Sequence, residues 1–424
     1  MVAFPQRDTH ISEVIPSFIL AHQRWDSLTQ VSALLMPVGA LFESMESAGL
    51  AHLIEHMVFR GTRSFRGAED IMMAAEGMGG RINAFTTYDY IVFLVQMPAT
   101  HWELSLKLLF ELAFYPLFRE EDLNTEKEVV LREMAMIEDD PSERAAVLFQ
   151  KAMWGEHRMG YDVIGFPNVV KNVERSDLVA FWKDAFFSYP VYFTTLGSVP
   201  YEEVKSFIQN FDFPTEFGRK KGKPWDYVKK AEFSGSEIVK REKTNQTYYR
   251  VGLEIYPYRT PEWQERKYHI SIISAMLGGT SFSKLVQEIR DRRGWAYSVG
   301  ATISGSVAGS SLVWYMDVLP GVVYEVESIL FKEFDALSRG SICDDKFEKA
   351  RTYVVGSTMM SSDSMHSSAL AHLMNVAFNG ELWDPERDVK RLMALKTGDI
   401  VEEFNRLTEG KNFAKVIYGE MAQG

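Results

Sequence analysis

The spacing of apolar positions changes along the chain between one typical of strands and one typical of helices, and this pattern predicts an α+β protein. A two-residue period or a short continuous apolar run predicts a strand, and a spacing of three to four residues predicts a helix. In the first half, the pattern predicts strands at 14–21, 31–39, 81–97 and 193–197, and helices at 68–78, 102–114, 120–140, 143–154, 177–185 and 201–211. One further helix, which carries most of the candidate chemistry, is predicted between the second and third of these strands.

The second half repeats this order weakly. It has one predicted strand within 237–253 and others at 298–304, 311–318 and 413–419, with helices at 262–277, 281–293, 321–338, 344–360, 367–378 and 397–407. A polar, basic stretch at 214–234 separates the halves and is predicted to be a linker. The sequence therefore predicts two α+β domains of similar plan, residues 1–213 and 235–424.

The remaining helix contains the sequence His-Leu-Ile-Glu-His. It is predicted to begin after Ser47 as N-cap, and Gly61 can end it. Residues four apart share one helix face, so His52 and His56 can both bind one metal ion. Glu55 lies beside them and can accept a proton from water. This is the inverted zincin order, H-x-x-E-H. The alternative is a pair of histidines satisfied by ordinary hydrogen bonds, although three polar groups in so apolar a segment would be costly to bury.

Zinc in a catalytic site needs a third protein ligand. The helix at 120–140 offers Glu126 and Glu133, which lie two turns apart on one face, whereas Glu128 points elsewhere. We interpret Glu133 as the ligand and Glu126 as a neighbour that orients the site. Spacing alone leaves the choice between the two nearly even, and an acidic amphipathic helix without a metal has the same pattern.

These motifs resemble the M16 family of metallopeptidases, which includes pitrilysin, insulin-degrading enzyme and the mitochondrial processing peptidase. Members carry H-x-x-E-H and a glutamate ligand roughly 75 to 80 residues further on, and Glu133 lies 77 residues after His56. The flanking Gly49, Phe59 and Gly61-Thr62 also match, and the resemblance covers about residues 12–419. It implies a half-clamshell of two similar αβ domains, each a mainly antiparallel sheet packed against helices.

The resemblance also implies roles outside the zinc motif. An arginine and a tyrosine seven residues apart in the second half of M16 proteins match Arg290 and Tyr297, which would hold the substrate backbone and the oxyanion. Residues Asn83-Ala84-Phe85 match an exposed edge strand that pairs with an extended substrate. By the pattern alone, these segments are a charged helix end and an ordinary amphipathic strand.

Composition and charge bear on the partners and the cellular compartment of the protein. The 424 residues carry a net charge of −12 and no strongly basic block, which argues against a nucleic-acid partner. The single cysteine, Cys343, cannot form an internal disulfide, so the protein suits a reducing compartment or simply does not depend on disulfides. No apolar run reaches 18 residues, so no membrane span is expected. Because the N-terminus resembles neither a signal nor a transit peptide, we expect a cytoplasmic protein, or alternatively a mature mitochondrial matrix form.

We therefore expect a zinc endopeptidase that cleaves unfolded peptides or targeting presequences, with one zinc ion per chain. Cobalt or manganese could occupy the same ligands. M16 chambers consist of two halves, and this chain supplies one, so a homodimer is expected, or a heterodimer with a related subunit. The alternative is a catalytically silent scaffold or peptide-binding subunit resembling the core proteins of the respiratory bc1 complex, in which the zinc motif is typically degraded.

Overall fold

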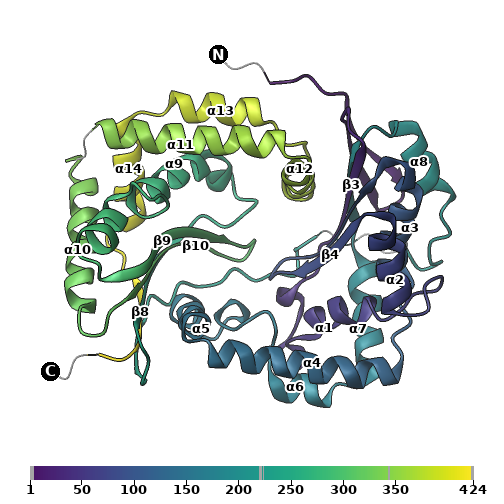
Figure 1. The fold of residues 1–424 in the computed structure, drawn as a ribbon, viewed down its shortest axis with the longest axis horizontal. Coiled ribbons are helices and arrows are strands. Elements are labelled where there is room, and N and C mark those ends of the chain that lie inside the picture. The colour runs from purple at the N-terminus through teal and green to yellow at the C-terminus, as the bar shows by residue number, and fades with distance from the viewer. Residues whose placement is uncertain (1–3, 219–221, 223, 342–343, 422–424) are drawn as a thin grey trace. The chain divides into compact units, whose positions relative to one another are not determined.

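A computed structural model describes residues 4–218, 222, 224–341 and 344–421. The described chain forms two compact units, each with its own sheet and helices (Figure 1). Unit 1 is drawn from Met1–Met134, Val163–Val228 and Ser361–Asp384, and unit 2 from Ala135–Asp162, Lys229–Met360 and Pro385–Gly424. The predicted α+β fold class is confirmed, with two antiparallel-rich sheets packed against helices.

Unit 1 contains a six-stranded sheet in the order β1-β2-β6-β3-β5-β4. Its strands are β1 (Thr9–Ile15), β2 (Phe18–Arg24), β3 (Thr29–Met36), β4 (Arg81–Thr86), β5 (Ile91–Pro98) and β6 (Val191–Gly197). Its helices are α1 (Leu50–Val58), α2 (Ala68–Ala75), α3 (Trp102–Phe114), α4 (Glu120–Asp139), α6 (Pro167–Asn172), α7 (Arg175–Ser188), α8 (Tyr201–Asn210) and α12 (Met365–Asn379). The central strands β3, β5 and β6 are buried almost throughout, and their sequences are mostly apolar on both faces of the sheet. Strand β4 forms one edge of the sheet.

Unit 2 contains a five-stranded sheet in the order β7-β11-β8-β10-β9. Its strands are β7 (Glu237–Arg241), β8 (Thr247–Ile255), β9 (Ala296–Gly305), β10 (Ser310–Val318) and β11 (Ala414–Gly419). Its helices are α5 (Pro141–Trp154), α9 (Pro261–Leu277), a π-helix (Val286–Arg292), α10 (Val323–Ser338), α11 (Asp344–Asp363), α13 (Pro385–Ala394) and α14 (Thr397–Thr408). Its core centres on Trp314 and Tyr249, both fully buried.

The two sheets share one topology. Strands β2-β6-β3-β5-β4 of unit 1 correspond in order to β7-β11-β8-β10-β9 of unit 2. The first pair in each series is parallel, and the other three pairs are antiparallel. Strand β1 is an addition to unit 1. The expectation of two domains of similar plan is therefore confirmed at the level of strand order and direction.

One helix of each sequence half packs in the unit formed mainly by the other half. Helix α5 packs on β11 and β8 of unit 2, and α12 packs on β6 and β3 of unit 1. One of the points at which the chain passes from unit 1 to unit 2 lies between residues 228 and 229, inside the predicted linker. The linear division into 1–213 and 235–424 stays a prediction, and the linker's basic residues 219–221 and 223 lie outside the described residues.

The structure corrects two predicted strands and adds two helices. The run at 14–21 is two antiparallel strands, because the chain reverses at Pro16-Ser17, where Ser17 has a φ of 66°. The run at 81–97 is likewise a hairpin of β4 and β5. Helices α6 and α13 were not predicted. Among the described helices, none is both long and apolar enough to cross a membrane.

Candidate metal and catalytic site

Helix α1 positions both histidines, and a buried carboxylate fixes its start. The helix begins after Gly49, whose φ of 107° suits a residue without a side chain. Glu43 accepts hydrogen bonds from the backbone N–H groups of Gly49 (3.0 Å) and Ala51 (2.7 Å). The predicted N-cap, Ser47, is therefore wrong: it lies in a preceding 3-10 turn and bonds to Ser44.

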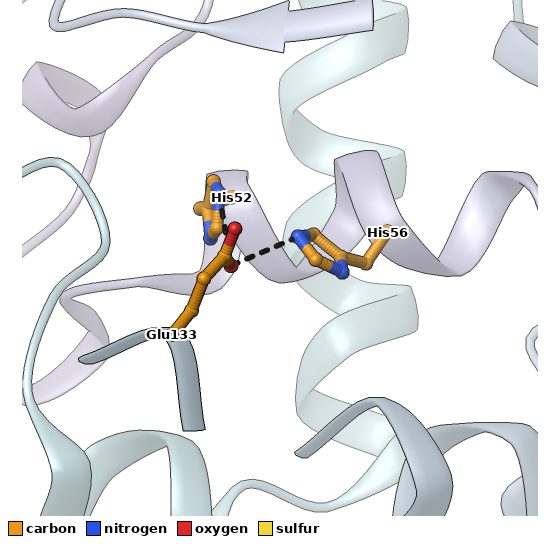
Figure 2. Close-up of side chains that lie close together, drawn as sticks. All are labelled: His52, His56 and Glu133. Atoms are coloured by element: carbon orange, nitrogen blue, oxygen red, sulfur yellow. Dashed lines mark ion pairs between the residues drawn. The ribbon is translucent and has the colours of Figure 1, made fainter. Parts of the chain in front are cut away.

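The structure brings His52, His56 and Glu133 together (Figure 2). Oε2 of Glu133, from α4, lies 3.4 Å from Nε2 of His56 and 4.0 Å from Nε2 of His52. The two imidazole centroids are 4.7 Å apart. Within the described part of the chain, this is the one group of three His, Cys, Asp or Glu side chains whose geometry suits a metal ion.

The donor set fits zinc. Ligand atoms about 2.1 Å from a tetrahedral zinc lie about 3.4 Å from one another, close to the observed spacing. Oε2 of Glu133 and Nδ1 of His52 are buried and have no hydrogen-bond partner among the described residues. A buried carboxylate oxygen without a partner is costly, and a bound cation would satisfy it.

The two histidines differ in electrostatic environment. Burial, followed by the neighbouring His56, lowers the pKa of His52 to about 4, so this imidazole is neutral at pH 7. Burial also opposes protonation of His56, but the hydrogen bond to Glu126 and the charge of Glu133 outweigh it and raise the pKa of His56.

Glu126 contacts His56 from the side away from Glu133. Its Oε2 lies 2.9 Å from Nδ1 of His56, and its Oε1 accepts a hydrogen bond from Nε of Arg60. Burial opposes its ionisation, but the hydrogen bonds from His56 and Arg60 lower the pKa of Glu126. The structure thus places Glu126 against Nδ1 of His56 and Glu133 against Nε2 of both histidines, and their roles as orienting neighbour and ligand stay predictions.

Glu55 of α1 is hydrogen-bonded to the edge strand β4. Its Oε2 accepts a hydrogen bond from Oγ1 of Thr86, the last residue of β4, at 2.7 Å. Burial raises the pKa of Glu55, and the bond from Thr86 only partly offsets this effect. In the same strand, Asn83 is exposed, Ala84 buried and Phe85 half-buried.

Arg290 and Tyr297 both belong to unit 2. Arg290 lies in the π-helix, and its Nε donates to Asp291 at 2.8 Å. Tyr297 is the second residue of the edge strand β9, and it is 89% exposed. The role predicted for the two side chains stays a prediction.

The sequence interpretation missed three supporting residues. Glu43 caps α1, Arg60 holds Glu126, and Glu111 accepts hydrogen bonds from Thr62 Oγ1 and Ser64 N, both at 2.7 Å. Burial works against ionisation of Glu111, yet these bonds lower its pKa. Of the three, only Arg60 carried a signal, since it stands four residues after His56.

Comparison with solved structures defines the class of fold. A protease from Helicobacter pylori superposes with a TM-score of 0.86 at 16% identity, over 97% of this chain and 100% of that chain. A peptidase M16 inactive domain from Pseudomonas fluorescens gives 0.86 at 16% identity, over 99% of both chains. The duplicated sheet architecture is therefore that of M16 peptidase-like proteins.

Sequence comparison then gives the family. The family model described as Insulinase (Peptidase family M16) matches residues 23–165, and Peptidase M16 inactive domain matches residues 172–354. The chain belongs to peptidase family M16. It is 27% identical to the uncharacterized zinc protease YmxG of Bacillus subtilis over 78% of both chains. It is also 26% identical to an uncharacterized zinc protease of Streptomyces coelicolor, over 84% of this chain and 77% of that one.

Proposed function

We propose that the chain is a zinc-dependent endopeptidase that hydrolyses unfolded peptides or presequences. The observation that carries this proposal is the convergence of three donors, His52, His56 and Glu133, with Glu55, which is bonded to an edge strand. The relatives named zinc proteases support zinc as the metal, with one ion per chain.

The chain's own residues would divide the chemistry. Zinc, when bound, supplies a Lewis acid that polarises a carbonyl and acidifies water. Glu55 accepts a proton from the water that attacks the scissile carbonyl, and then passes it to the leaving amine. Glu126 holds His56 in orientation. This route requires no covalent enzyme intermediate.

The substrate would bind as an additional strand on β4. Backbone groups of Asn83, Ala84 and Phe85 would hydrogen-bond an extended peptide largely independently of its sequence. The bond from Thr86 to Glu55 links the end of this strand to the proposed base. Arg290 and Tyr297 would donate hydrogen bonds to the substrate carbonyl and to the oxyanion formed from it. We further propose that two copies of the chain, or one copy and a related subunit, enclose the substrate.

The test is cleavage of a library of unstructured peptides of roughly 10 to 30 residues, long enough to add a strand to a sheet edge. Wild type is compared with Glu55→Gln and with Glu128→Gln, an exposed glutamate of α4. Products are identified by mass spectrometry with and without a chelator. We expect cleavage by wild type and by Glu128→Gln, and none by Glu55→Gln or after chelation, with zinc restoring activity.

The opposite result would favour a scaffold or peptide-binding subunit. If zinc-loaded wild type binds the peptides but leaves them intact, the endopeptidase proposal fails for this chain alone. Repeating the assay with a co-purified related subunit then separates a missing partner from a silent protein.

A further inference from the structure

We propose that Arg60 is a positioning residue of the metal site, which holds Glu126 against His56 and thereby sets the affinity of the site for its metal. This inference rests on the proposed function, because it assumes that His52, His56 and Glu133 bind zinc. Arg60 lies two residues beyond the last residue of α1 and four residues after His56.

The contacts of Glu126 carry the argument. Its side chain is only 4% exposed, and its two oxygens have different partners. Oε2 accepts from Nδ1 of His56 at 2.9 Å, and Oε1 is in contact with both Nε and Nη2 of Arg60. A buried carboxylate needs a charged or hydrogen-bonding partner to offset the loss of water. Arg60 supplies that partner on the oxygen that His56 does not use.

The backbone of Arg60 is itself held in place. Its N–H donates to the carbonyl of Met57 at 3.1 Å, and its carbonyl accepts from Nη1 of Arg119 at 3.3 Å. The same Nη1 of Arg119 bonds Asp122, in the first turn of α4, at 3.2 Å. The end of α1 and the start of α4 are therefore joined around Arg60, and its guanidinium is directed at Glu126.

The contacts of Glu126 also determine which nitrogen of His56 can bind a metal. With Oε1 occupied by Arg60, Oε2 is oriented to accept the Nδ1–H of His56. That hydrogen bond selects the tautomer in which Nε2 carries a free lone pair, and Nε2 is the atom that lies 3.4 Å from Oε2 of Glu133. Without Arg60, Oε1 is a buried acceptor with no partner, and the Glu126 side chain gains freedom to turn away from the histidine.

The competing explanation is that Arg60 only ties α1 to α4. To distinguish the two, zinc affinity is measured by competition with a chromophoric chelator. The absorption of the cobalt-substituted protein and the thermal unfolding of the metal-free protein are measured in parallel. Arg60→Leu is compared with Arg60→Lys and with the control Arg66→Leu, since Arg66 is 91% exposed and forms its ion pair with Asp70.

We expect Arg60→Leu to weaken zinc binding about 10-fold or more, the size typical of losing an outer partner of a ligating histidine. Arg60→Lys should recover part of this loss, since it restores the charge without the planar pair of donors. Arg66→Leu should stay within about twofold of wild type, as expected for an exposed pair. A shifted cobalt spectrum in Arg60→Leu, with little change in metal-free unfolding temperature, would also support a positioning role.

A double-mutant cycle with Glu126→Gln completes the test. If Arg60 acts through Glu126, then Arg60→Leu should cost less than about twofold in zinc affinity once Glu126 is already Gln. Unchanged affinity in Arg60→Leu, or an equal loss in both backgrounds, would overturn the inference. Should Arg60→Leu fail to fold, Arg60→Met removes the charge and every donor while keeping an unbranched stem, and a wild-type affinity in that variant overturns it equally. A wild type that binds no zinc would instead refute the proposed function.

Discussion

The two units carry the same sheet topology, but only unit 1 carries the metal-site residues. Helix α1, which follows β3, holds His52 and His56, whereas α9, which follows β8, has the single histidine His269. Helices α4 and α11 correspond in order and are both 20 residues long. The seventh and fourteenth residues of α4 are Glu126 and Glu133; those of α11 are Ala350 and Ser357.

The comparison shows that the sheet topology does not depend on the side chains of the metal site. Strand pairing depends on backbone groups and on apolar faces, and both sheets retain these features. A metal site depends on a few polar side chains, each buried at a cost that only the ligand or a partner offsets. The match of residues 172–354 to a family domain described as inactive agrees with this division. The predictions below test it from the largest expected effect to the smallest.

The largest effect is expected for Glu55→Gln. Loss of a general base typically costs about 10²- to 10⁴-fold in rate, so peptide cleavage should fall by that amount. Zinc content and unfolding temperature should be retained, since Gln has the same shape. Ser357→Ala, at the position of α11 that corresponds to Glu133, should leave the rate unchanged. A comparable loss in Ser357→Ala would contradict the restriction of the chemistry to unit 1.

The next effect concerns metal affinity. Glu133→Gln should weaken zinc binding by more than about 100-fold, because a direct ligand contributes more than an outer hydrogen-bond partner. Glu128→Gln, five residues earlier and exposed, is the matched control and should bind zinc like wild type. Equilibrium dialysis with metal analysis measures both. Equal affinities in the two variants would remove Glu133 from the site.

Helices α5 and α12 each pack on the sheet formed mainly by the other half of the sequence. A truncation in either helix is therefore expected to destabilise the unit in which it packs. Leu373 of α12 and Phe149 of α5 are both almost fully buried, and Phe149 packs against Gly252 of β8. Leu373→Ala should cost about 2–5 kcal/mol and reduce amide-exchange protection in β3 and β6. Phe149→Ala should cost about 3–5 kcal/mol and reduce protection in β8 and β11. Loss of protection in the opposite sheet would contradict the assignment of these helices.

The smallest effect is a pH dependence of unit 1. Burial, followed by the charge of Arg7, lowers the pKa of His372 to about 4, and its Nδ1 accepts from the N–H of Trp383 at 3.2 Å. The unfolded chain binds a proton near pH 6.5 and the folded one does not. The stability contributed by neutral His372 is therefore lost as the pH falls from 6.5 towards 4, by up to about 3 kcal/mol.

Urea unfolding at several pH values, compared with His372→Asn, measures this effect. Asn retains an acceptor near the position of Nδ1 but does not titrate, so its stability curve should be flatter than that of wild type in this window. Parallel curves for the two proteins would show that His372 titrates normally in the folded state.

Much of this structure was predictable from local pattern. The helix predicted at 102–114 has the bounds of α3, and the spacing of His52, His56 and Glu133, together with the family resemblance, predicted the group that the structure brings together. The reversal at Ser17 was missed because it uses a left-handed residue other than glycine. Glu43 acts on α1 from outside the helix, so no periodicity indicates its contact. The packing of α5 in unit 2 and of α12 in unit 1 depends on contacts between distant segments of the chain. The pattern of apolar and polar positions within a segment does not indicate such contacts.

This packing of α5 and α12 has a consequence for synthesis on the ribosome. Helix α5 is made before the strands it covers in unit 2, so it is available when that sheet forms. Helix α12 is made long after β3 and β6, and until residue 379 has emerged, the face of the unit 1 sheet that it covers stays open. Exposed apolar strands in a nascent chain are prone to aggregate. The unit that holds the candidate metal site is thus started first but is completed only near residue 384, so a chain truncated before α12 would carry every proposed ligand on an unfinished sheet.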